Sequence, residues 1–409
     1  MHLLALAAAG RSIRLGAPVV TSPRGLDDAL RLAASTVATG WLRGVDYHEA
    51  VAGPLDRDRL DALVPARPVR VQHRSGQMWV LNTAALQATG FEALDDPGVE
   101  RDATGRATGR LYRMDEALRA RAGAPLPDVG AAALELAARG VTGVTDMTPY
   151  QQLDDLAVLA GEAARPGFPV AVAVTGGAAL ATADVGLARG PVKVVLDDAR
   201  LPGLDELVAA FGAARSAGRA VAVHCVTRAE LVMALAAWDT VGTVPGDRVE
   251  HGAVIPVELD AALRERGLVV VTQPSFVAVR GDQYVADVDP GDIDALWRCG
   301  SLLVAGVGVA GSSDAPYGDP DPWRGIAAAA ERTTPSGRVL GAAERIPARR
   351  ALDLWLTPLD DPAGAPRRIL PGRPADLCLL TEPLDVALRD PSSVTVRATI
   401  RAGEVVARG

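Results

Sequence analysis

The chain has 409 residues, of which 49% are hydrophobic and 22% are charged, and its net charge is −8. This length and apolar content are sufficient for one large core. The acidic balance and the lack of a basic cluster exclude nucleic acid as an expected partner, because such binding relies on lysine and arginine against phosphate. No apolar run reaches the roughly 18 residues of a membrane span, so we expect no membrane segment.

The three cysteines, Cys225, Cys299 and Cys378, are widely spaced and odd in number. This usage favours a reducing compartment over a disulfide framework, and we expect a cytoplasmic protein. The opening segment MHLLALAAAG is short and has no basic residues before its apolar run. We interpret it as the end of a strand that continues into a helix, and not as an export signal.

The first third of the chain has a mixed pattern. Leu26–Thr39 has the apolar spacing of a helix, and Val69–His73 is typical of a strand. Few other segments between about residues 20 and 125 show a regular period. We therefore predict that this stretch is an insertion that roofs an active site.

From Asp128 the pattern becomes a regular alternation of apolar strands and amphipathic helices. Strands are predicted near residues 144, 171, 194, 222, 249, 270 and 309, and a helix over Ile293–Ala305 precedes the last of them. Continuous Val/Ile/Leu runs separated by helices indicate a parallel sheet with crossover helices. The pattern predicts a (β/α)8 barrel over residues 1–355 with its first strand mostly missing.

The tail changes character after residue 355. The segments PGRPADLCLL and VRATIRAGEVV are typical of strands joined by turns. We predict a small β module over residues 356–409.

Four predicted strands carry one chemically active side chain each, and these are Lys193, His224, His251 and Asp314. Active sites of barrels lie at the carboxyl ends of the strands, so these side chains are expected to converge. Imidazole and carboxylate together favour zinc, with iron or manganese as alternatives. Lys193 has a second interpretation, in which its stem packs and its amine reaches solvent.

The ordered motifs GPVKVV, AVAVHC, RVEHG, TQPS and GSSDAP resemble the amidohydrolase superfamily, in the family 3 branch that includes N-substituted formamide deformylases. The tail is similar to the β-sandwich of these enzymes. The resemblance implies that Lys193 is carbamylated and bridges two metals. It also implies that Asp314 binds metal, accepts a proton from the attacking water and passes it to the leaving nitrogen.

The start of the chain departs from the family pattern. The family opens its first barrel strand with His-x-His, and His2 resembles the second of these histidines. The first would precede Met1, so we expect either a misassigned or shortened start or a naturally reduced form. The resemblance thus implies one or two metal ions. His224, His251 and Lys193 would hold one firmly, and the position of His2, Lys193 and Asp314 would be weak or empty.

We predict a metal-dependent hydrolase that acts on a non-peptide carbon–nitrogen bond of a small molecule. Candidate substrate contacts are His73, Arg74 and Gln273, and His48 and Glu49 are either further contacts or ordinary loop residues. The alternatives are an impaired or scaffold-like homologue and a lyase or isomerase that uses the same site. A homodimer is the expected assembly if the chain self-associates.

Overall fold

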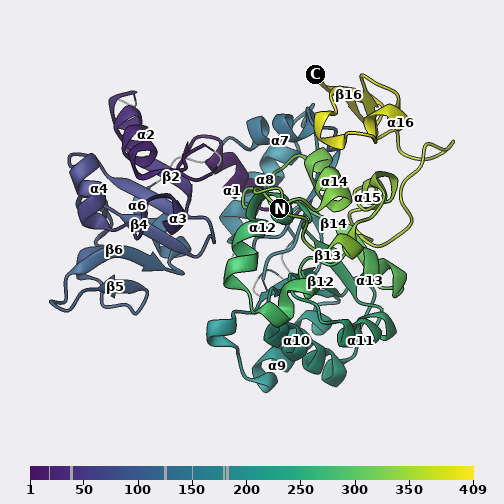
Figure 1. Ribbon diagram of the computed structural model, residues 1–409, viewed down its shortest axis with the longest axis horizontal. Helices are drawn as coiled ribbons and strands as arrows, with labels where there is room; N and C mark the ends of the chain where they lie inside the picture. Colours follow the sequence, from purple (N-terminus) through teal and green to yellow (C-terminus); the bar gives the residue numbers. More distant parts are fainter. Residues whose placement is uncertain (18, 37–39, 124–126, 150, 178–179, 181–183) are drawn as a thin grey trace. The chain divides into compact units, whose positions relative to one another are not determined.

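The computed structural model describes residues 1–17, 19–36, 40–123, 127–149, 151–177, 180 and 184–409. The chain forms two compact units, each with its own sheet structure (Figure 1). Unit 1 contains Met1–Leu4 and Val129–Gly409, and unit 2 contains Ala5–Asp128. Among the described residues, no helix is long and apolar enough to cross a membrane.

Unit 1 is built on parallel strands in two sheets. The five-stranded sheet follows chain order, with β10 (Val192–Val195), β11 (Val221–Cys225), β12 (Arg248–His251), β13 (Val269–Thr272) and β14 (Gly308–Gly311). The three-stranded sheet contains β7 (Gly143–Asp146), β8 (Ala171–Val174) and β9 (Ala188–Arg189). All neighbours in both sheets are parallel. The seven predicted strands are therefore confirmed, and unit 1 has an α/β fold.

Helices alternate with these strands. They are α7 (Val129–Ala137), α8 (Leu153–Ala163), α9 (Leu204–Ser216), α10 (Arg228–Val241), α11 (Asp260–Glu265), α12 (Ser275–Asp287), α13 (Gly300–Val304), α14 (Pro322–Glu331) and α15 (Ala348–Asp353). The aromatic rings of Phe211 on α9 and Trp238 on α10 lie 5.3 Å apart in the core between helices and sheet. Because helices cover the sheet, its strands are apolar almost throughout.

The helix predicted over Ile293–Ala305 is wrong. The structure has a 3-10 helix at Pro290–Ala295 and the short α13, with an irregular segment between them. There Trp297 adopts a φ of 49° and its amide donates to the carbonyl of Ala253 at 2.8 Å. Arg298 is buried and donates two hydrogen bonds to Asp260, each 2.7 Å long. These tertiary contacts override the helical spacing.

The two parallel sheets are linked by single backbone hydrogen bonds. At one side the amide of Lys193 donates to the carbonyl of Gly176, at 2.9 Å. At the other side the first two residues of the chain lie between the ends of β7 and β14. The amide of Met147 donates to the carbonyl of Met1 at 2.8 Å, and the amide of His2 donates to the carbonyl of Ala315 at 2.7 Å.

The tail of unit 1 forms a three-stranded antiparallel sheet of β15 (Leu377–Leu380), β16 (Val396–Arg401) and β17 (Glu404–Arg408). A four-residue helix, α16 (Leu384–Ala387), lies between the first two strands. The hydroxyl of Thr399 donates to the carbonyl of Ala137 at the end of α7, which attaches the sheet to the parallel part. The predicted tail strands are present, and a full β-sandwich stays a prediction.

Unit 2 contains a mixed six-stranded sheet in the order β1-β2-β3-β4-β6-β5. Its strands are β1 (Ile13–Arg14), β2 (Leu42–Tyr47), β3 (Val69–His73), β4 (Met78–Leu81), β5 (Val99–Arg101) and β6 (Ala107–Tyr112). Its helices are α2 (Pro23–Thr36), α3 (Glu49–Ala52), α4 (Arg57–Leu63), α5 (Thr83–Thr89) and α6 (Asp115–Ala122), while α1 (Leu3–Ala9) begins in unit 1. Residues 37–39 of the predicted first helix lie outside the described residues. The stretch predicted as an insertion falls within unit 2, and its role as a roof stays a prediction.

Candidate metal centre

Two histidines lie side by side at the ends of neighbouring strands. His224 is on β11 and His251 ends β12, and the parallel register puts Cys225 opposite His251. The two imidazole rings meet edge to face, with centroids 4.4 Å apart and planes at 68°. Burial lowers the pKa of His224 well below its ordinary value, and the charges of His251 and Lys193 lower it further. Burial also lowers the pKa of His251. Both rings are therefore neutral at neutral pH.

Gln273 fixes the tautomer of His251. Its side-chain amide nitrogen donates to the carbonyl of Val271 at 3.2 Å, which turns the amide oxygen towards the imidazole. This oxygen lies 2.9 Å from Nδ1 of His251 and accepts a hydrogen bond from its N–H group. The Nε2 atom of His251 is then unprotonated, as a metal ligand requires. Gln273 was predicted as a substrate contact. In the structure its side-chain amide is hydrogen-bonded to His251 and to the carbonyl of Val271.

Asp314 and His2 form the second pair. Their Oδ1 and Nε2 atoms lie 3.2 Å apart, although the two residues are far apart in the sequence. Nδ1 of His2 is 3.0 Å from the hydroxyl of Thr148, and the ring of Tyr317 packs edge-on at 5.4 Å. Burial raises the pKa of Asp314, but the hydrogen bond to His2 and the charge of His251 hold that pKa below its usual range. Asp314 is therefore ionised at neutral pH.

Lys193 is buried on β10 beside two other charged groups. The guanidinium of Arg248 donates to Glu250 at 2.6 Å, and both side chains are buried. Burial lowers the pKa of Lys193, while the charges of Glu250 and Asp314 oppose that shift. Burial raises the pKa of Glu250, but Arg248 and Lys193 hold it below its ordinary value. Lys193 therefore lies inside a charged cluster, with its pKa below the ordinary value.

Asp146 positions the first residues of the chain and was missed at the sequence level. Its buried carboxylate accepts hydrogen bonds from the amides of Leu3 and Thr148, at 2.6 and 2.9 Å, and from the side chain of Gln151 at 3.0 Å. It thereby holds His2 close to Asp314. The available signal was its place at the end of an apolar strand, the same placement that marked the other candidates.

Two candidate ligands have unusual backbone conformations. His251 has a φ of 71° and Asp314 a φ of 52°, a region that residues other than glycine seldom occupy. Strain of this kind persists where the surrounding structure overdetermines it, and it is concentrated at functional sites. The backbone thus marks the same two residues as the sequence pattern.

The remaining predicted contacts, His73 and Arg74, lie in unit 2 at the end of β3. His73 Nε2 is 3.0 Å from Glu49 Oε2, and the amide of Arg74 donates to the carbonyl of Tyr47 at 2.8 Å. Within the described residues, the structure pairs His2 with Asp314 and His224 with His251, and it places His73 in a separate cluster.

The donor set of unit 1 fits a divalent metal. Neutral imidazoles and an ionised carboxylate are the ligands that zinc and similar ions prefer. Among the described residues, however, His224, His251 and Asp314 do not form a trio whose ligand atoms all lie within 4.8 Å of one another. Metal–ligand bonds of about 2.0–2.2 Å require closer approach, so one ion can contact all three only after side-chain movement.

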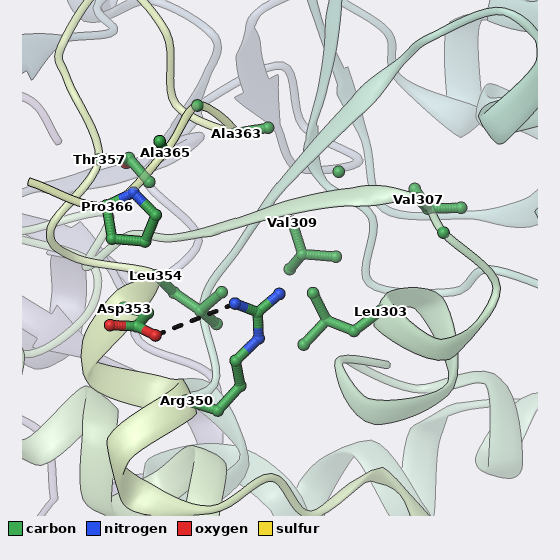
Figure 2. A pocket seen from close by; sticks show the side chains of 13 residues that line it. Leu303, Val307, Val309, Arg350, Asp353, Leu354, Thr357, Ala363, Ala365 and Pro366 are labelled. Carbon is green, nitrogen blue, oxygen red and sulfur yellow. Dashed lines mark ion pairs between the residues drawn. The ribbon is translucent and has the colours of Figure 1, made fainter.

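A cavity of about 340 Å³ lies elsewhere in unit 1. It is lined by the start of β14 and by α15, including Val307, Arg350 and Asp353, as Figure 2 shows. Asp314 follows the opposite end of β14. This cavity is therefore not the predicted site.

Comparisons with known proteins identify related structures and the family of the chain. Solved structures of uncharacterized metal-dependent hydrolases from Pyrococcus horikoshii OT3 and Pyrococcus furiosus are 20% identical to it, with TM-scores of 0.68 and 0.64. Each match covers 87% of this chain and 78% or 79% of the other, and at this identity the likeness shows a shared fold. No match was found among curated proteins. The model of the amidohydrolase family matches residues 1–407, and the chain therefore belongs to the amidohydrolase family.

Proposed function

We propose that the protein is a metal-dependent hydrolase of non-peptide carbon–nitrogen bonds in small molecules, in the formamide deformylase branch of its family. The observation that carries this proposal is the pair of neutral, edge-to-face imidazoles of His224 and His251 within the electrostatic reach of an ionised Asp314. We further propose that the parallel strands and the segment at Met1–His2 belong to a (β/α)8 barrel. The hydrogen bonds of this segment to the ends of β7 and β14 support it.

Each residue has a distinct role in this proposal. His224 and His251 hold a divalent metal, for which zinc is the best chemical match, and His2 and Asp314 serve a second position. A metal bound there would polarise the scissile carbonyl and make water a better nucleophile. Asp314 accepts a proton from the attacking water and delivers it to the leaving nitrogen, a double role open to a carboxylate near both atoms.

Lys193 would act as an anionic ligand after reaction with CO2. Its neutral amine forms a bond to the carbon of CO2 and loses a proton, which gives a carbamate. The lowered pKa of Lys193 favours the neutral amine that this reaction needs. The carbamate would also supply ligand oxygens to a centre in which the two histidines and Asp314 are too far apart to share an ion as they stand.

The test combines metal content with turnover. Purified full-length chain is analysed by elemental mass spectrometry and assayed on an N-substituted formamide, a cyclic amide, an N-acyl amino acid and a dipeptide. We expect bound metal and hydrolysis of one of the first three, with a lower metal content and loss of hydrolysis in His224→Gln. Lys193→Arg keeps a cation but cannot form the carbamate, and it should lose activity as well. Full turnover in either variant would refute the assignment, and a chain without metal or turnover would favour the scaffold alternative.

A further inference from the structure

We propose that unit 2 contains a metal site of its own, formed by His48, Glu49 and His73, which binds a divalent transition-metal ion such as zinc. Within the described residues, these three are a trio whose candidate ligand atoms all lie within 4.8 Å of one another. All three belong to unit 2, and none belongs to the centre proposed for unit 1.

The sheet of unit 2 brings the trio together. Strands β2 and β3 are parallel neighbours, and their register pairs Tyr47 with His73. His48 follows Tyr47 directly, so both imidazoles leave the same edge of the sheet. Glu49 is the first residue of α3 and lies between them in contact with both rings. Two strand ends therefore supply fixed positions for the ligands, which is how precise sites are usually held.

The distances suit a tetrahedral ion. Glu49 Oε2 lies 3.0 Å from Nε2 of His73 and 3.8 Å from Nε2 of His48. Two ligands on tetrahedral zinc, each bonded at about 2.0–2.1 Å, are about 3.3 Å apart. The observed separations fall on either side of this value, so the carboxylate needs shifts of only a few tenths of an ångström relative to each imidazole. The two rings are 5.3 Å apart and tilted by 37°, and they do not stack face to face.

The cluster is sheltered on the histidine side and open on the carboxylate side. The side chains of His73 and His48 are 15% and 19% exposed, whereas that of Glu49 is 42% exposed. Three protein ligands with one side open to solvent leave a fourth position for water or a small ligand. Two imidazoles also disfavour calcium and magnesium, which take oxygen ligands.

The protonation states are compatible with metal binding. Burial raises the pKa of Glu49, but a backbone hydrogen bond and His73 hold it below its ordinary value, so the carboxylate is charged. Nδ1 of His73 is 2.8 Å from the hydroxyl oxygen of Ser75. Nδ1 also accepts from the amide of Ser75 at 3.1 Å, so it must give up this contact and donate to the hydroxyl oxygen before Nε2 can bind metal. Nδ1 of His48 likewise accepts from the amide of Ala50, at 3.1 Å, and this helix cap must be given up for Nε2 to bind.

The experiment uses the full, untagged chain with Co²⁺ as the probe. The variant His224→Gln/His251→Gln removes the centre proposed for unit 1, and Co²⁺ binding is followed by visible absorption and elemental analysis. We expect about one Co²⁺ per chain in this background, with the bands of a four- or five-coordinate ion. Adding His48→Gln and His73→Gln, or Glu49→Gln alone, should abolish this binding. Glu100→Gln, a carboxylate of the same unit that pairs with Arg110, is the matched control and should bind normally.

A second variant separates a metal site from a purely structural histidine–glutamate pair. Ser75→Ala removes the acceptor for His73 and should weaken Co²⁺ binding by about 10–100-fold, because partners of this kind orient metal-binding imidazoles. The trio substitutions are also made in the wild-type chain, in case His224→Gln/His251→Gln does not fold. There each trio variant should bind about one Co²⁺ fewer than the wild type. Absence of Co²⁺ from a folded background, or equal binding with and without the trio, would overturn the proposal. Neither result depends on hydrolysis, so it leaves the proposed function to its own test.

Discussion

Gln273 offers the sharpest test of how the proposed centre is prepared for metal. Gln273→Leu keeps a similar volume but removes the oxygen that accepts from Nδ1 of His251, at 2.9 Å. It also removes the donor to the carbonyl of Val271. The imidazole then loses its fixed tautomer, and its buried N–H has no partner. Loss of such an orienting partner costs about 10–100-fold in metal affinity, or about 1.4–2.7 kcal/mol.

The assay is competition for Zn²⁺ against a chromogenic chelator, with wild type and variant at the same pH. Gln87→Leu, an exposed glutamine of α5 in unit 2, controls for the chemistry of the substitution. The metal-free variant should also be less stable in urea by about 1–3 kcal/mol, the cost of a buried donor without a partner. Zn²⁺ affinity of Gln273→Leu within about twofold of wild type would refute the reasoning, since an orienting partner is worth at least about tenfold.

Three further perturbations have defined outcomes. The pKa values of His224 and His251 are lowered in the native state, so the unfolded chain takes up protons first as the pH falls. The free energy of unfolding should therefore decrease below about pH 6.5, by about 1.4 kcal/mol per pH unit for each fully responding histidine. Urea titrations of metal-free wild type and His224→Gln/His251→Gln between pH 7 and 5 should diverge by this amount, and parallel curves would contradict the reasoning. Asp247→Ala removes the ion-pair partner of Arg215 and the acceptor of the amides of Val221 and Val244, so a loss of about 3–5 kcal/mol in urea is expected. Asp146→Ala should release the segment before α1 and speed amide exchange at Leu3, whereas exchange in unit 2 stays as in wild type.

The candidate metal ligands that lie on strands could be predicted from the sequence, but the residues that they contact could not. Lys193, His224 and His251 each lie in a short apolar run. Such runs are visible in the sequence because the strands of a parallel sheet that is buried on both faces are apolar almost throughout. The contact of His2 with Asp314 depends instead on how distant segments meet, which no local period encodes. The same holds for the pairing of His48 with His73, which follows from the register of β2 and β3.

Local patterns also failed where tertiary contacts dominate. The spacing of Ile293–Ala305 suits one helix, yet Trp297 and Arg298 make buried contacts with other segments that interrupt it. Gln273 was recognised as a polar residue at a strand end, but its amide orientation depends on the carbonyl of Val271. The sequence thus predicted which polar residues lie at strand ends, whereas the contacts of each side chain became known only from the three-dimensional structure.

The division of the chain has a consequence for the order of folding. Met1–Leu4 belongs to unit 1 but is separated from the rest of that unit by the whole of unit 2. Docking of His2 beside Asp314 therefore closes a loop as long as Ala5–Asp128, at an entropic cost of about 4 kcal/mol if that loop is unfolded. Once unit 2 has folded, its two ends are held near each other, as the ion pair of Arg11 with Asp128 indicates. Assembly of the proposed centre is then a late step that depends on a domain contributing none of its ligands.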